Sequence, residues 1–203
     1  MNWHDRKARA AANKLARQID ELYIKYSRML IALGAKYEIN DAIFSFKSVG
    51  AHSEVESILI DFRADLIALY TGGVSVAVGL SEMKSKALLK AVGATGKLSD
   101  KMITPNSILH GERLSTRVWK LGEGLREQME LLLDTGIREG KGAAAMTKDL
   151  KKYLNDPDRL YRRVRDNHGE LKLSRAAKDY HPGAGVYRSS HQNAMRLART
   201  SMN

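Results

Sequence analysis

The sequence predicts a mainly α-helical protein: an elongated helical bundle with long heptad-patterned helices, followed by a small basic α+β module with a candidate β-hairpin. Only 3 of the 203 residues are proline, which favours long helices over an all-β chain built from many turns. Two segments carry apolar residues at alternating spacings of four and three, which is the pattern of a helix with one apolar face. Apolar residues make up 43% of the chain, enough for a packed core.

The first helix is expected to end at Gly34, in the manner of a glycine that follows a helix. At about 1.5 Å per residue, such a helix is about 45 Å long and must bury its apolar face on another helix of this chain or of a neighbouring subunit. Five of its residues are candidate partner-interface residues: Leu15, Ile19, Leu22, Tyr26 and Met29. The full heptad series adds Ala8, Ala12 and Leu33.

A second helix is predicted to start at Ser53, which has the capping-box spacing to Glu56. The pair Gly72-Gly73 is expected to end it. Residues 74–78 are then a short strand or an extended link, and a third helix covers about 81–92, followed by a loop over 93–104. The 16 residues from Leu66 to Ser81 carry no charge. They fall short of the roughly 20 needed to span a bilayer, so a buried helix end is the simpler interpretation and a membrane-active segment the alternative.

The next helix is predicted to start near Pro105 or Ser107 and to end at Gly136 and Gly140. Its apolar series is Leu114, Val118, Leu121, Leu125, Gln128 and Leu132. Three of these residues, Val118, Leu121 and Leu125, are further candidates for a partner interface. A shorter helix covers about 143–154, a turn follows at 155–158, and one or two helical turns cover 159–164.

The pattern changes after Arg165. The turn residues 166–169 (DNHG) separate Val164 from Leu171 and Leu173, which predicts a small β-hairpin. Ser174 is expected to cap a short helix through Lys178, and Ser189 or Ser190 a last helix that runs to Asn203 without a stop signal. We therefore expect two regions, a helical region over 1–104 and a helical region with the basic module over 105–203.

The charge pattern limits the classes of function. The formal net charge is +11, and residues 101–203 contribute +8 of it. There is no cysteine, which excludes disulfides and cysteine-ligated metals. The phosphate-loop pattern fails at Ala91 and Leu98, and no metal-binding histidine pair or catalytic set stands out. We expect no enzyme activity, no metal and no cofactor.

The basic residues gather between Arg159 and Lys178, near Tyr161. They are candidates for nucleic-acid binding, because arginine pairs with phosphate and aromatic rings stack on bases. A solvated face, or a patch that pairs with an acidic protein, are the alternatives. The candidate residues are Arg159, Arg162, Arg163, Arg165, Lys172, Arg175, Lys178 and Arg188.

An ordered series of motifs in residues 115–203 resembles the head-morphogenesis proteins of tailed phages and prophages, the Mu F-like minor head family. The motifs are 136–140 (GIREG), 153–158 (YLNDPD), 162–169 (RRVRDNHG), 173–178 (LSRAAK), 180–183 (YHPG), 185–190 (GVYRSS) and 193–200 (NAMRLART), with Asn203. In that family, residues 199–203 resemble the opening of a longer conserved core, so we expect chain beyond Asn203.

The resemblance implies a structural protein of the virion, at the capsid interior or the portal, that occupies the host cytoplasm during assembly. Its implied partners are portal and capsid proteins, and packaged DNA is a candidate partner. It implies a role in head assembly, DNA packaging or ejection, and an oligomeric state in the assembly. We expect no membrane partner. The alternative is a free helical nucleic-acid-binding protein that uses the cluster from Arg159 to Lys178.

Overall fold

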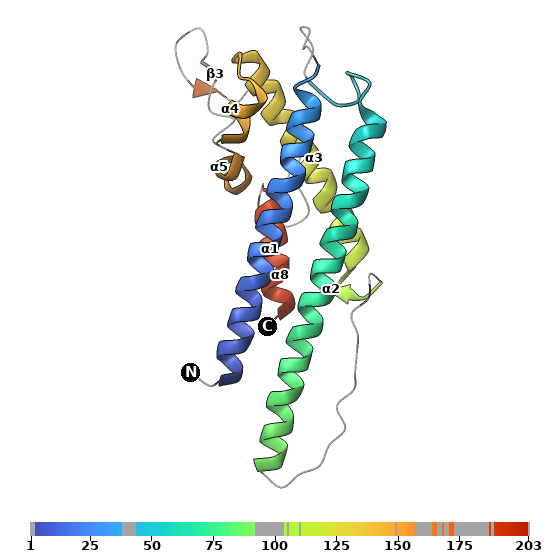
Figure 1. The fold of residues 1–203 in the computed structure, drawn as a ribbon, viewed down its shortest axis with the longest axis vertical. Helices are drawn as coiled ribbons and strands as arrows, with labels where there is room; N and C mark the ends of the chain where they lie inside the picture. The colour runs from blue at the N-terminus through green and yellow to red at the C-terminus, as the bar shows by residue number, and fades with distance from the viewer. Residues whose placement is uncertain are drawn as a thin grey trace.

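The chain forms a mainly α-helical, elongated bundle in a computed structural model. The structure describes residues 3–37, 44–91, 104, 106–109, 111–148, 150–156, 164–165, 168, 171–172, 187 and 189–202. Two long helices, α1 (Trp3–Gly34) and α2 (His52–Ala91), run antiparallel in one layer, with α3 (Leu114–Arg138) and α8 (Ser190–Met202) behind them (Figure 1). The predicted fold class is confirmed.

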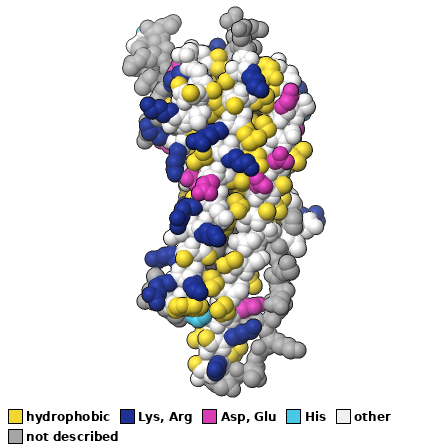
Figure 2. All heavy atoms as spheres, in the orientation of Figure 1, with side chains coloured by type: hydrophobic (Ala, Val, Ile, Leu, Met, Phe, Trp, Pro, Cys, Tyr) yellow, Lys and Arg dark blue, Asp and Glu magenta, His cyan; other side chains and the backbone are white. Residues whose placement is uncertain are grey.

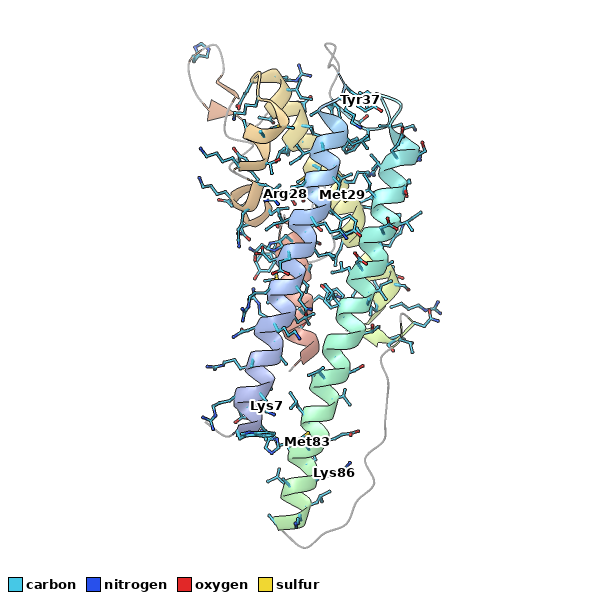
Figure 3. The ribbon with its side chains drawn as sticks, viewed as in Figure 1. Lys7, Arg28, Met29, Tyr37, Met83 and Lys86 are labelled. Carbon is cyan, nitrogen blue, oxygen red and sulfur yellow. The ribbon has the colours of Figure 1, made fainter. Side chains whose placement is uncertain are left out.

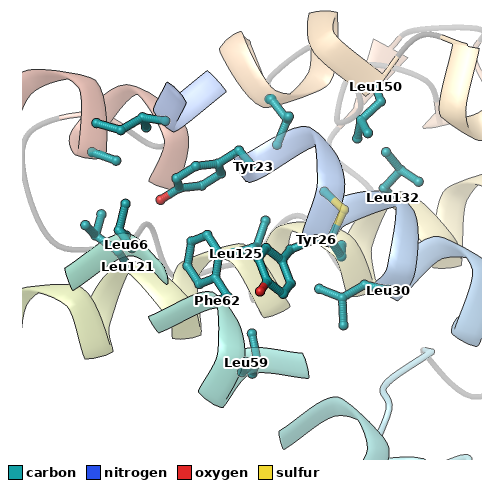
Figure 4. Packing of buried hydrophobic residues seen from close by; sticks show 14 of the residues in the cluster. Tyr23, Tyr26, Leu30, Leu59, Phe62, Leu66, Leu121, Leu125, Leu132 and Leu150 are labelled. Atoms are coloured by element: carbon teal, nitrogen blue, oxygen red, sulfur yellow. The ribbon is translucent and has the colours of Figure 1, made fainter. Parts of the chain in front are cut away.

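One hydrophobic core joins these four helices. It includes Tyr23 and Leu30 of α1, Phe62 of α2, Leu125 of α3 and Leu197 of α8 (Figure 4). Residues from both sides of the predicted boundary at 104/105 therefore share this core. α1 and the first half of α2 bury apolar side chains in this core, whereas Val76, Met83 and Leu88 in the second half of α2 are exposed.

Most of the predicted partner-interface residues lie in this core. Leu15, Ile19, Tyr26, Val118, Leu121 and Leu125 are buried. Leu22 is half-buried and Met29 is 40% exposed. The interpretation of these eight residues as candidates for a partner interface is therefore corrected for six of them, which pack inside the chain.

The buried face of α1 differs from the strict heptad series. Tyr23 and Leu30 are buried, where the series expects Leu22 and Met29. A straight helix has 3.6 residues per turn, so a 3.5-residue repeat drifts by about 20° per heptad away from a fixed face. α1 does end at Gly34, but this glycine does not have the positive φ of a glycine that follows a helix. It packs tightly instead, since an added Cβ there would collide with the Leu133 side chain.

The prediction that Gly72-Gly73 ends a helix was wrong. α2 is continuous over 40 residues and includes the predicted strand or link and the predicted third helix. An added Cβ at Gly73 would lie 2.7 Å from Leu15 Cδ2, so this glycine allows α1 to approach α2 closely.

The predicted capping role of Ser53 is absent. Its hydroxyl bonds Glu54 Oε2 at 3.0 Å, and the carbonyl of Ala51 accepts the first bond of the helix, from Val55 N.

The third long helix starts later than predicted. Strands β1 (Ile108–Leu109) and β2 (Glu112–Arg113) pair antiparallel around Gly111, whose φ is +84°, and α3 begins at Leu114. Its predicted end is confirmed. Gly140 has a φ of +70°, and the bonds Gly140 N to Ile137 O (2.9 Å) and Lys141 N to Gly136 O (2.8 Å) form a Schellman motif.

The remaining elements are short. The predicted helix over 143–154 is described as α4 (Ala143–Lys148) and α5 (Leu150–Asn155). The predicted hairpin is confirmed: β3 (Val164–Arg165) pairs antiparallel with β4 (Leu171–Lys172), Val164 opposite Lys172. The predicted loop over 93–103, the turns over 159–163 and the helix over 174–178 lie outside the described residues.

Candidate functional site at the start of the last helix

A buried polar junction surrounds the N-terminus of α8, where Tyr187 and residues 189–200 meet the bundle. Ser189 caps the helix: its hydroxyl accepts a bond from Gln192 N at 3.1 Å and donates one to the carbonyl of Leu154. Asn193 Nδ2 donates to Tyr187 O at 2.6 Å, and Tyr187 N donates to Asn193 Oδ1 at 3.1 Å. These bonds fix both the start of the helix and the chain that enters it.

Two buried tyrosines connect α8 to the long helices. The Tyr23 hydroxyl of α1 donates to Ser190 O at 3.1 Å and lies 2.8 Å from Ser190 Oγ. Ser190 Oγ donates to Leu121 O of α3 at 2.7 Å. The Tyr70 hydroxyl of α2 donates to Ala194 O at 2.7 Å. Burial raises the pKa of Tyr70 well above its ordinary value, so this hydroxyl stays a donor.

His191 completes the junction. Its side chain is 3% exposed, its Nε2 lies 3.2 Å from Asp20 Oδ1, and its ring stacks edge-on against Tyr23. Asp20 Oδ2 in turn lies 2.7 Å from Lys151 Nζ of α5. Burial lowers the pKa of His191, an effect larger than the opposing one of Asp20.

Ser190, His191 and Asp20 are the residue types of a nucleophile, a base and an orienting acid, but their geometry is not that of a catalytic set. The Ser190 hydroxyl donates to a backbone carbonyl and lies against Tyr23, and both Ser190 and His191 are buried. The described groove between α1 and α2 is lined by none of the three. The arrangement joins four helices; it does not present a hydroxyl to a substrate.

The candidate nucleic-acid residues are described only in part. Arg165 and Lys172 lie on the paired strands β3 and β4, which brings these two positions of the cluster onto neighbouring strands. The other six lie outside the described residues: Arg159, Arg162, Arg163, Arg175, Lys178 and Arg188. Among the described residues, no group of three metal-ligating side chains occurs.

A second basic surface lies on α1, and the sequence reasoning missed it. Lysine and arginine side chains line the exposed side of this helix (Figure 2). Several have no ion-pair partner within the described part of the chain, among them Arg6, Lys14, Arg17 and Arg28. Counting charge by halves hid this surface, because α1 carries seven Lys and Arg against three Asp and Glu while the remainder of residues 1–100 has a net charge of −1.

The tyrosine contacts were missed as well. A buried tyrosine needs a partner for its hydroxyl, so a tyrosine among the apolar positions of a helix indicates a polar contact in the core. Tyr23 and Tyr70 carry this signal, although the sequence does not say which backbone carbonyl they reach.

α2 is long and apolar enough to cross a membrane by length and composition, the one such helix in the described part of the chain. Only 17% of the most apolar window of α2 is buried.

No protein-family model, no curated protein and no solved structure matches this chain.

Proposed function

We propose that the protein is a structural component of a phage or prophage head, located at the portal or the capsid interior, where it aids head assembly, DNA packaging or ejection. The ordered motifs of residues 115–203 support this proposal. The observation that carries it is the role of the 193–200 motif: its buried residues hold α8 in the bundle. A motif used for packing and backbone bonding fits an assembly protein better than a catalyst.

The other side of α8 is available for contacts. Arg196, Arg199 and Thr200 are exposed, while Ala194, Leu197 and Ala198 face the core. Arginine is enriched at protein interfaces, where its planar head bonds carboxylates and carbonyls. These two arginines are therefore the described residues of the motif that we assign to a portal or capsid contact.

Fractionation of lysates from producing cells tests the proposal. The protein is expected to sediment with procapsids or virions. Arg196→Glu combined with Arg199→Glu should keep the fold and leave the particle fraction, because the reversed charges oppose the contact. Lys86→Glu with Lys90→Glu, at the far end of α2, is the matched control and should stay with the particles. Absence of the wild-type protein from both kinds of particle would contradict the proposal.

A second candidate function is nucleic-acid binding by a free helical protein, favoured by the cationic side of α1. Such binding should weaken steeply with salt, since it depends on phosphate contacts. Replacing Arg162, Arg163 and Arg165 with alanine tests the cluster from Arg159 to Lys178. Replacing Arg6, Lys14 and Arg17 tests α1. No binding of the wild-type protein at low salt would exclude this function.

A further inference from the structure

The outer face of the α1–α2 layer contains a groove of about 310 Å³. Its lining includes four small residues, Ala11, Ala68, Gly72 and Gly73, so a side chain from outside could enter between the helices. Val76 also lines the groove and is 51% exposed. The groove can therefore receive an apolar side chain from another molecule. Val76, at its edge, is an apolar side chain of a size to enter such a groove.

The apolar surface continues along α1. Leu22 and Leu33 are half-buried and Met29 is 40% exposed, and all three belong to the 3.5-residue series that the internal core does not fully use. Figure 3 shows Met29 on α1 and Met83 on α2. Apolar residues at this spacing that the core does not bury are typical of a helix that packs on two partners. One partner is a helix of the same chain, and the other is a separate molecule.

The charges on the two edges of this face are opposite. The α1 edge is basic, with Lys7, Lys14 and Arg28 exposed, and the first half of the α2 edge is acidic, with Glu54 and Asp61 exposed (Figure 2). Between the two edges, Lys25 already pairs with Asp65 at 3.3 Å. Arg28 and Asp61 have no ion-pair partner among the residues that the structure describes.

We propose that a second copy of this chain covers this face, related to the first by a twofold axis parallel to the helices. Such an axis places α1 of each copy opposite α2 of the other and keeps residues at the same level along the bundle. Arg28 then faces Asp61 of the second copy, and Val76 faces the second copy's groove, since Val76 and Ala11 lie at one level. Both contacts occur twice, as a closed twofold interface requires.

The size of the face fits this occupant. A helix pair about 45 Å long and about 20 Å wide presents on the order of 900 Å², close to the roughly 800 Å² per partner of a stable interface. The separation of charge also favours a protein over a membrane. Most of the apolar stretch of α2 is exposed, but its residues Leu66 and Tyr70 lie in the core and the Tyr70 hydroxyl bonds Ala194 O of α8. A bilayer could not surround this part of α2 without breaking that contact.

Sedimentation equilibrium of the full chain across roughly 1–100 µM tests the proposal, because this range covers moderate dimer affinities. The wild-type protein is expected to dimerise. Val76→Glu and Met29→Glu should each weaken the dimer at least about tenfold, since each buries an unpaired charge. Ile60→Glu is the control: Ile60 is exposed on another side of α2, and its replacement should leave the dimer unchanged.

A charge-reversal pair tests the orientation. Arg28→Asp and Asp61→Arg should each weaken the dimer, and the double variant should recover most of the loss. Circular dichroism of every variant checks that the helices are kept.

Three results would overturn the proposal. One is a wild-type protein that stays monomeric across the range, and another is a dimer indifferent to Val76→Glu and Met29→Glu. The third is a monomer that floats with anionic vesicles through Val76 and Met29, which would assign the face to a lipid surface. None of these results depends on whether the protein is found in phage particles.

Discussion

The hydroxyl of Ser190 is the centre of the contacts that hold α8. It donates to Leu121 O and lies beside the Tyr23 hydroxyl, so its removal deletes two buried polar contacts between α8 and the helices α1 and α3. Ser190→Ala should lower the free energy of unfolding by about 1–3 kcal/mol, measured by urea denaturation. Ser75→Ala is the control, because the exposed Ser75 hydroxyl bonds only its own helix at Thr71 O, and the change should stay within about 0.5 kcal/mol. Equal effects of the two changes would contradict the role of Ser190.

The buried imidazole of His191 makes stability depend on pH. Burial holds its pKa below its usual 6.5, so the unfolded chain binds the proton more tightly than the folded one. The free energy of unfolding should therefore fall as pH drops from 6.5 toward the lowered value, and be fully retained above 6.5.

Glu130 acts in the opposite direction, because burial raises the pKa of its carboxyl above 4.5 and folding then favours the protonated form. Comparison of the wild type with His191→Gln isolates the contribution of His191, since both proteins keep Glu130. The stability of the wild type relative to the variant should decrease below pH 6.5. A constant difference between pH 7.5 and 5 would contradict the burial of a neutral His191.

At the scale of elements, the course of α2 is the clearest difference between sequence and structure. A glycine pair normally weakens a helix, because glycine loses the most backbone freedom and is about 1 kcal/mol less favourable than alanine. Here Gly73 allows the close approach of α1, and the burial of Tyr70 and Val74 on either side of the glycine pair stabilises the continuous helix. Local propensity could not reveal this contact, since Leu15 is more than fifty residues away in the chain.

The two glycines provide a matched test of the continuous helix. Nothing lies within 4 Å of an added Cβ at Gly72, so Gly72→Ala should raise the free energy of unfolding by up to about 1 kcal/mol. Gly73→Ala gains the same helix propensity but displaces Leu15, and it should be less stable than Gly72→Ala by about 1 kcal/mol or more. If the helix ended at this pair, neither the gain nor the difference would be observed in thermal or urea unfolding.

Other elements were predictable because their signals are local. Gly140 ends α3 through its own positive φ, Ser189 caps α8 through its own hydroxyl, and β3 pairs with β4 as the turn sequence between them predicts. The side of α1 that faces the core was harder to predict, because a 3.5-residue series and a 3.6-residue helix agree over only two or three turns.

For the whole molecule, the decisive feature is the shared core of the N-terminal and C-terminal helices. Phe62 and Tyr70 of α2 are covered together with Leu121 of α3 and Ala194 of α8. A fragment of residues 1–104 would expose this surface to water, so it should lose cooperative thermal unfolding, and the fragment 105–203 should restore it on mixing. Independent cooperative unfolding of 1–104 would contradict a shared core. The sequence suggested two regions because charge and pattern change near residue 104, but composition does not report which faces meet.

The central claim is that this bundle is a structural part of a phage head, and quantitative mass spectrometry of gradient-purified particles tests it most directly. The account predicts that the protein keeps a constant molar ratio to the portal protein across the particle fractions of the gradient. A protein confined to the free fractions, with none in procapsids or virions, would contradict it.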